Sequence, residues 1–195
     1  MNKNIYKAAK IFSYIFIPPV MNLFIFIIFS NHYESNLKNL IGITISFLFG
    51  LLIPMITILI FRKKGLLSDN DATIKEERTT PYVYAIIYST IGIVLTLFFE
   101  LNDYITMLWL VYLLNSIIIL IINYFWKVSA HTMGVGMPLG AIFFLNNHFL
   151  LLITAIILVI VVLARLILKV HTILQLIVGA IIGFLNSYLI LKYLL

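Results

Sequence analysis

The sequence contains no cysteine, and aspartate and glutamate together supply only 7 of its 195 residues. The absence of cysteine excludes disulfides and gives no indication of the redox compartment. Charged residues of both signs make up 10% of the chain, against about 25% in an ordinary soluble domain. Hydrophobic residues make up 63%, and the mean hydropathy is +1.14. This composition excludes an ordinary soluble domain and indicates an integral membrane protein.

The apolar residues fall in runs of about 20, the length of helix that crosses about 30 Å of hydrocarbon. Because backbone polar groups in lipid must be paired within their own segment, such runs are predicted to be helices. Seven candidate spans are predicted, at residues 11–30, 40–61, 81–100, 104–126, 132–147, 148–168 and 171–194. The predicted fold class is therefore all-α, a polytopic transmembrane helix bundle of six to seven spans that forms a single integral membrane domain over 1–195.

Two of these spans contain residues that affect the topology. Pro18 and Pro19 are expected to kink the first span or to break its early turns. The lysines ahead of that span resemble the start of a signal peptide, but no small-residue cleavage site follows, so the helix is expected to be retained. The fifth span, 132–147, is rich in glycine, which leaves open whether it crosses the membrane fully or re-enters.

The distribution of lysine and arginine predicts the orientation. All of the 13 basic residues except Lys38 and Lys192 lie at the N-terminus or in the loops after the second, fourth and sixth spans. Positive charge accumulates on the cytoplasmic side of membrane proteins, so the N-terminus is predicted to be cytoplasmic, in a bacterial inner membrane. The formal net charge of +6 is accordingly attributed to topology and to anionic lipid headgroups, and no nucleic-acid partner is expected.

Three polar clusters lie at span ends, where charges and histidines favour a functional interpretation. The first contains Lys75 and Arg78, three residues apart, on a short helix predicted after Thr73. The other two are Val128-Ser129-Ala130-His131 and the series Arg165, His171 and Gln175. With seven spans all three clusters fall on one side of the membrane, where cations and donors would suit a phosphate group.

The last span has a regular pattern that begins at the third cluster. His171, Gln175, Gly179 and Gly183 are spaced by four, so they lie along one helix face. Gln175 is expected to hydrogen-bond His171 and to fix its tautomer. Gly179 and Gly183 form a small-xxx-small pattern that lets another helix approach closely, and Gly136 and Gly140 repeat it in the fifth span.

These motifs resemble those of the type 2 phosphatidate phosphatase superfamily, which shares its core fold with vanadium haloperoxidases. Ala164-Arg165, five residues, His171 and then Gln175 resemble its third motif, with glutamine where the family has aspartate. Val128-Ser129-Ala130-His131 keeps the serine and histidine of the second motif but lacks its proline and glycine. Lys75 and Arg78, with Pro81 beyond them, resemble the first motif. The resemblance covers roughly residues 75 to 183, and it implies a phosphatase-like core at about 62–194.

The resemblance also implies a role for each residue. His171 would be the nucleophile that forms a phosphohistidine, and His131 the acid that protonates the leaving group. Arg165 would act with them in catalysis by holding phosphate oxygens, and Gln175 would orient His171. Lys75, Arg78, Ser129 and the amide of Ala130 would bind the phosphate. The implied function is hydrolysis of an amphiphilic lipid phosphate, such as a polyprenyl diphosphate or a phosphatidate-like lipid, with no metal and no cofactor.

The sequence leaves other interpretations open. The histidines also suit interfacial residues bonded to a carbonyl or a headgroup, and Lys75 and Arg78 suit a solvated loop. Gln175 and the weak first motif favour a protein that binds or transports a lipid phosphate without hydrolysing it. Asp69, Asn70 and Asp71 suggest an intramembrane prenyltransferase, although such enzymes need a second aspartate-rich loop to hold Mg²⁺, which is missing here. Membrane lipids are the expected partners, and homo-oligomerisation is left open.

Overall fold

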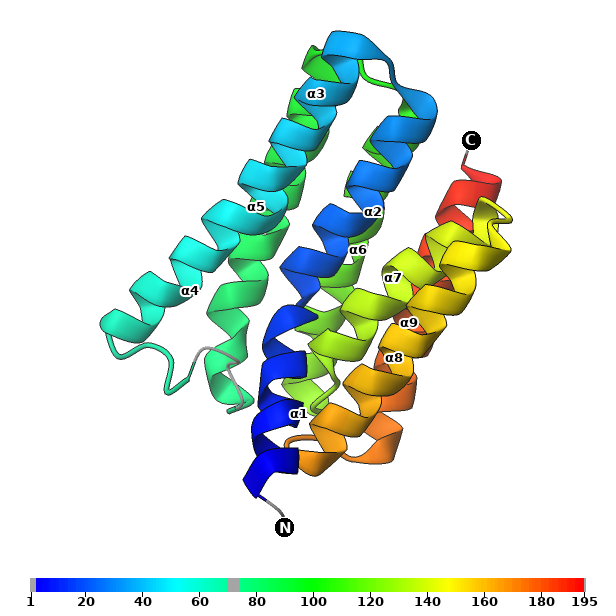
Figure 1. The fold of residues 1–195 in the computed structure, drawn as a ribbon. Helices are drawn as coiled ribbons and strands as arrows, with labels where there is room; N and C mark the ends of the chain where they lie inside the picture. The colour runs from blue at the N-terminus through cyan, green and yellow to red at the C-terminus, as the bar shows by residue number, and fades with distance from the viewer. Residues whose placement is uncertain (1–2, 70–73, 195) are drawn as a thin grey trace. The chain divides into compact units, whose positions relative to one another are not determined.

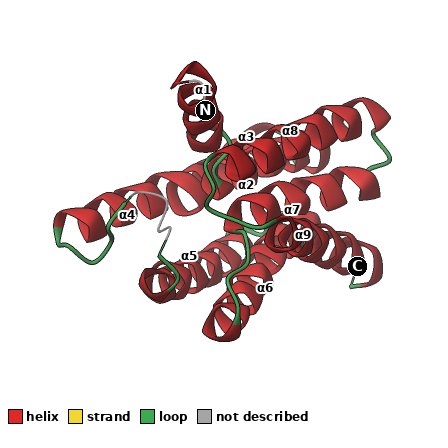
Figure 2. Ribbon diagram, turned by 90° about the horizontal axis from the view of Figure 1, so that it is seen from below, coloured by secondary structure: helices red, strands yellow, loops and turns green. Residues whose placement is uncertain are grey.

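A computed structural model of the chain describes residues 3–69 and 74–194, and within them it contains helices and loops without a strand (Figures 1 and 2). The N-terminal helices are α1 (Lys3–Ile15), α2 (Pro18–Tyr33) and α3 (Asn36–Ile45), and α3 continues through the π-helical η1 (Ser46–Leu52) into α4 (Ile53–Lys63). The single 3₁₀ turn η2 (Glu76–Arg78) precedes α5 (Thr79–Phe98) and α6 (Asp103–Phe125). The last three helices are α7 (Ala130–Phe144), α8 (His148–Ile167) and α9 (Ile173–Tyr193).

Five of the described helices are long and apolar enough to cross a membrane: Asn36–Lys63, Glu76–Phe98, Asp103–Phe125, His148–Ile167 and Ile173–Tyr193. The helices α1 and α2 would make a sixth as a broken pair, with a bend of 48° between them. The bend lies at Pro18, which begins α2, so the predicted break at the proline pair is present. The predicted fifth span is α7, whose 15 residues extend about 22 Å and fall short of the hydrocarbon thickness.

The starts of α6 and α8 are fixed by polar side chains at the N-cap. Asn102 caps α6 by accepting from Tyr104 N at 3.1 Å, and Asn147 caps α8 by accepting from Leu150 N at 3.0 Å. Such oxygens pair the backbone N–H groups that the first helical turn leaves without an acceptor. The short polar loops before α6 and α8 therefore set where these two helices begin.

The chain divides into two compact units, each described by itself. The terminal unit comprises Met1–Met21 with Val128–Leu194, and the central unit comprises Asn22–Lys127. The terminal unit contains α1, α7, α8 and α9, and α7 packs against both α8 and α9. The predicted phosphatase-like core at 62–194 draws on both units, and the single domain over 1–195 stays a prediction.

Glycines allow α7 and α9 to approach until their backbones touch. A Cβ atom added at Gly136 would meet Ala180 O, and one added at Gly140 would meet Phe184 O. The glycines of α9 are equally close to α7, with Ser129 O at 2.5 Å from a Cβ placed on Gly179. Both predicted small-xxx-small pairs therefore lie in one interface, where each helix presents its glycines to the backbone of the other.

The core of the central unit is organised around Trp109 of α6, which is fully buried. Its indole lies against Gly92 of α5, where an added Cβ would collide with the ring, and 3.7 Å from a Cβ placed on Gly50. The ring of Phe26 on α2 packs against it, with centroids 4.6 Å apart. The two glycines thus make room for a side chain that joins three helical segments to α6.

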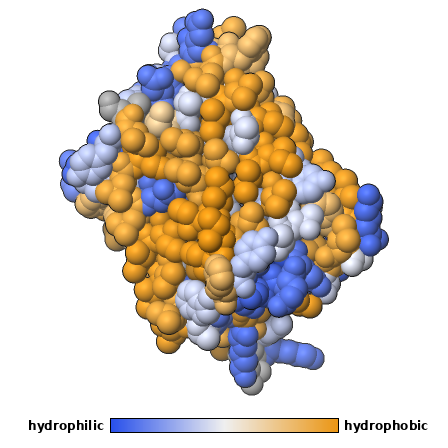
Figure 3. Space-filling model, turned by 180° about the vertical axis from the view of Figure 1, so that it is seen from behind, coloured by the Kyte–Doolittle hydropathy of each residue, from blue (hydrophilic) through white to orange (hydrophobic). Residues whose placement is uncertain are grey.

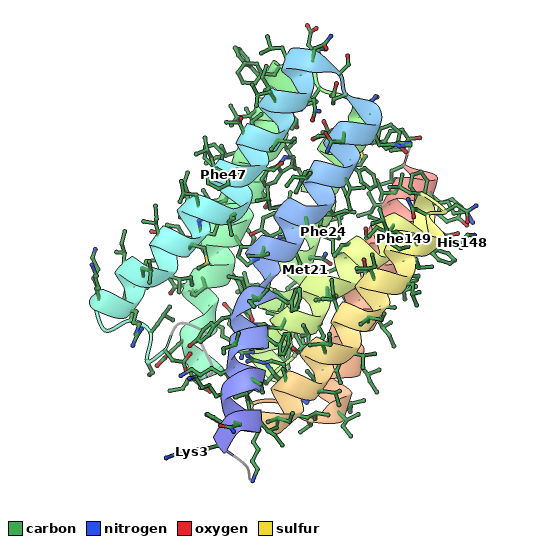
Figure 4. The ribbon with its side chains drawn as sticks, in the orientation of Figure 1. Lys3, Met21, Phe24, Phe47, His148 and Phe149 are labelled. Carbon is green, nitrogen blue, oxygen red and sulfur yellow. The ribbon has the colours of Figure 1, made fainter. Side chains whose placement is uncertain are left out.

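The outer surface is mostly apolar, as lipid contact requires. Hydrophobic colouring covers most of the face seen in Figure 3. Phe47 and Phe149, labelled in Figure 4, project outward from their helices and are 42% and 71% exposed. Exposed apolar area of this extent is unusual in a soluble monomer, so it supports an integral membrane protein.

The glycine interface predicts a difference between two alanine substitutions. Gly183→Ala would place a methyl group against Met133 O and 3.0 Å from Met137 N, whereas Gly50→Ala would meet only a side-chain atom at 3.7 Å. Because backbone atoms cannot move aside cheaply, we expect Gly183→Ala to destabilise the protein by about 1–3 kcal/mol. Gly50→Ala is expected to be neutral. Thermal unfolding of both variants in detergent measures this, and equal midpoints would contradict the interface.

Candidate functional site

The N-termini of α7 and α9 lie together at one end of the terminal unit. The two helices run parallel, because Ser129 and Met133 follow one another along α7 in the same direction as their contacts Gly179 and Gly183 along α9. At the shared end, Ser129 N donates to Gln175 O at 3.2 Å. The partial positive charges of two helix N-termini are therefore close together, which favours an anion at this end.

The hydrogen bonds around Gln175 fix the tautomer of His171. Gln175 Oε1 accepts from Thr172 N at 3.1 Å, as part of a capping box that starts α9. Because a backbone N–H can only donate, the Gln175 atom that faces it must be the oxygen. His171 Nδ1 lies 3.1 Å from the same oxygen, so Nδ1 carries the proton. Nε2 of neutral His171 therefore holds the lone pair.

The second predicted motif forms the start of α7. Ser129 is the N-cap, and its Oγ accepts from Thr132 N at 3.4 Å. Ala130 is the first helical residue, so its amide belongs to the turn whose N–H groups lack an intrahelical acceptor. His131 follows it and is 6% exposed. The serine, the amide and one histidine thus lie beside the first turns of α9. These turns directly follow His171 in the sequence.

Arg165 adds a buried cation near the C-terminal end of α8. Its side chain is fully buried, and its Nη1 donates to Ser13 Oγ of α1 at 2.7 Å. Val170 N donates to Arg165 O at 3.3 Å, which fixes the turn that leads from α8 to His171. Arg165 thus places a guanidinium group, which can bind phosphate through several N–H donors, at this end of the unit.

The formal charge of the chain is divided unequally between the units. All 7 acidic residues lie in the central unit together with seven of the 13 basic residues, so that unit has no formal net charge. The terminal unit has no aspartate or glutamate in its sequence and carries the whole +6. The positive charge of the terminal unit is therefore not offset by acidic side chains of the same unit.

Lys75 and Arg78 belong to the central unit, so they are described apart from the site residues of the terminal unit. Lys75 Nζ donates to Tyr124 O at 3.0 Å, and Asn123 Nδ2 donates to Lys75 O at 3.0 Å. Arg78 is buried and hydrogen-bonds the hydroxyl of Tyr82. The predicted short helix is the single 3₁₀ turn η2, and Thr73 lies outside the described residues. Phosphate binding by the two cations stays a prediction.

Three residues of this site were not identified from the sequence. Thr172 caps α9, and the spacing Thr-x-x-Gln could have indicated it as a capping box. Thr132 Oγ1 donates to Leu176 O at 2.8 Å and so joins α7 to α9. Ser13 is 152 residues from Arg165, and no local pattern connects them.

Of the three residues named in the aspartate-rich loop, the structure describes Asp69. Asn70 and Asp71 lie outside the described residues. Elsewhere in the described ranges there is no group of three or more histidine, cysteine, aspartate or glutamate residues that could hold a metal ion.

The tautomer of His171 can be measured directly. ¹⁵N NMR of histidine-labelled protein, with the resonance assigned by its loss in His171→Asn, should show the proton on Nδ1. Gln175→Leu removes the acceptor and should abolish this preference. The matched variant Gln175→Glu keeps a side-chain oxygen at the capping position and should retain it. A proton on Nε2 in the unmodified protein would contradict the assignment.

Comparison of the chain with known proteins identified no relative. No protein-family model matches the chain, and neither a curated protein nor a solved structure matches it. The function proposed below therefore follows from the residues of the site and from the motifs they form.

Proposed function

We propose that the protein is a membrane-embedded lipid phosphate phosphatase that works through a phosphohistidine at His171. The proposal includes a helical core like that of the type 2 phosphatidate phosphatases. The observation that carries it is the pairing of His171 Nδ1 with Gln175 Oε1, which leaves Nε2 as the nucleophilic nitrogen. Buried Arg165 and the start of α7 lie in the same unit and supply positive charge and donors for a phosphate.

The first chemical step transfers the phosphoryl group to the enzyme. The Nε2 lone pair of His171 attacks phosphorus, and the bond between phosphorus and the lipid oxygen breaks. His131 gives a proton to that oxygen, so the lipid leaves as an alcohol or, from a diphosphate, as a monophosphate. Arg165, Ser129 and the Ala130 amide hold the remaining phosphate oxygens, whose charge increases in the transition state.

The second step regenerates the enzyme. His131, now neutral, takes a proton from water, and the resulting hydroxide attacks phosphorus as the bond to Nε2 breaks. Inorganic phosphate leaves, and His171 returns to its starting form. Gln175 keeps the imidazole oriented in both steps through its hydrogen bond to Nδ1. The reaction needs no metal ion, because fixed cations and helix N-termini supply the positive charge.

The substrate class follows from where the site lies. Its residues belong to the ends of apolar helices, so the phosphate group of a substrate would lie near the membrane surface with its chain in lipid. A polyprenyl diphosphate and a phosphatidate-like lipid both fit this description.

We further propose that the N-terminus and the site face the cytoplasm, as the lysine and arginine bias predicts. A reporter fused ahead of Met1 tests this, and an external signal would refute it.

One observation favours a second candidate, a protein that binds or transports a lipid phosphate without hydrolysing it. The residue that orients His171 is Gln175, which is uncharged. An aspartate would stabilise the positively charged imidazole that forms on phosphoryl transfer, whereas glutamine gives orientation alone. Binding of a lipid phosphate without release of phosphate would identify this second function, and release gained in Gln175→Asp would show that the missing charge is its cause.

The phosphatase proposal is tested by phosphate release from a panel of lipid monophosphates and diphosphates, without added metal. We expect release by the unmodified protein and a loss of more than about a thousandfold in His171→Ala, because the nucleophile is removed. His148→Ala is the matched control, since His148 begins α8 in the same unit, at the far end of that helix from Arg165. Full activity of His171→Ala would refute the proposed role.

A further inference from the structure

The N-terminal helix α1 lies outside the segment that resembles the phosphatase core, yet it contacts the site. Its only buried residues are Ala9 and Ser13, which are four apart and so share one face. Within the terminal unit α1 packs against α8, the helix that carries Arg165. Ser13 is 1% exposed, and its Oγ accepts the hydrogen bond from Arg165 Nη1 at 2.7 Å. The buried face of α1 is therefore directed at the buried cation.

The contact restrains the guanidinium group. Arginine has a long side chain with several rotatable bonds, and its planar fork binds phosphate well only in a defined orientation. A hydrogen bond to one terminal nitrogen restrains the orientation of the whole group, because its atoms are coplanar and move together. Serine is short, so the position of its Oγ is set by the backbone of α1. The orientation of Arg165 thus depends on where α1 lies.

A second contact to α7 lies just after α1, at the start of α2. Pro18 follows α1 at the bend, and a Cβ added to Gly134 would lie 2.7 Å from its Cβ and 2.8 Å from its Cα. Gly134 is one turn along α7 from Ala130, where the second motif begins. The residue that begins α2 is therefore packed against the helix that holds His131, while Ser13 of α1 binds the cation on α8.

We propose that Ser13 is a positioning residue that holds Arg165 in the orientation required to bind the phosphate of the substrate. The proposal rests on the phosphate site described above and assigns it a component from α1. Ser13 does not contact the substrate; it acts through the guanidinium group. The rival interpretation is that Ser13 only pairs a buried donor, in which case its loss would lower stability without changing the site's affinity for phosphate.

Four full-length proteins separate these interpretations: the unmodified chain, Ser13→Ala, Ser13→Thr and Ser187→Ala. Ser13→Thr keeps the hydroxyl. Ser187 is the matched control, because it is a fully buried serine of the same unit whose Oγ has no hydrogen-bond partner among the described residues. The measurements are kcat/KM for lipid phosphate hydrolysis and the inhibition constant of inorganic phosphate. A partly unfolded sample lowers the apparent kcat but leaves the inhibition constant unchanged.

Ser13→Ala is expected to raise the inhibition constant and to lower kcat/KM, each by about tenfold, the lower end of what a hydrogen bond to a charged group contributes. For Ser13→Thr both quantities should stay within about threefold of those of the unmodified chain. For Ser187→Ala both should equal those of the unmodified chain. An unchanged inhibition constant in Ser13→Ala would overturn the proposal, whatever happens to stability.

Failure of the positioning role can be distinguished from failure of the phosphatase proposal. If the unmodified protein releases no phosphate, hydrolysis is refuted, and the dissociation constant of inorganic phosphate, measured by titration calorimetry, takes the place of the inhibition constant. Weaker phosphate binding by Ser13→Ala than by Ser187→Ala would then still support the positioning role. Absence of phosphate binding by the unmodified protein would overturn both.

Discussion

The close parallel contact between α7 and α9 is the constraint on which the site depends. Glycines on both helices allow backbone-to-backbone approach, so the start of α7 lies directly beside the first turns of α9. A residue larger than glycine at any of these positions would push the two helices apart. The segment Ser129–His131 would then move away from His171. The hydrogen bonds from Ser129 N to Gln175 O and from Thr132 Oγ1 to Leu176 O act only because the helices are this close.

The same contact has an electrostatic cost that an anion would offset. Two parallel helices place like ends of their dipoles together, and each N-terminus carries about half a positive charge. Buried Arg165 increases the positive potential, and the terminal unit has no acidic residue in its sequence. A bound anion would offset both the repulsion between the two helix N-termini and the positive charge of Arg165. The arrangement is therefore better suited to a phosphate than to a neutral ligand.

The sequence predicted those features that depend on neighbouring residues. Long apolar runs predicted the membrane helices, and the pair Pro18-Pro19 predicted a kink, which the structure shows as a bend of 48°. The spacing of four predicted the contact between His171 and Gln175. The glycine pairs were identified as contact surfaces, but which helix each would meet was not. The run at 132–147 became a helix of 15 residues, because polar Ser129 and the turn before His148 limit its length.

What the sequence could not predict depends on residues far apart in the chain. The bond between Ser13 and Arg165 joins α1 to α8, and no pattern in the sequence marks Ser13 as the partner of Arg165. Burial of Arg165 was equally unexpected, since a basic residue near a span end is normally exposed at the interface. The division of charge between the units was visible in the composition but acquired meaning only when the structure separated the chain at Asn22 and Lys127.

The most direct test of the central claim is to trap the covalent intermediate. Protein mixed with a lipid phosphate and quenched during turnover under alkaline conditions, which preserve phosphohistidine, can be digested and examined by mass spectrometry. The proposed mechanism predicts one added phosphoryl group on the peptide that contains His171, and none in His171→Ala. Phosphate release without that adduct, or an adduct on a different residue, would contradict the mechanism.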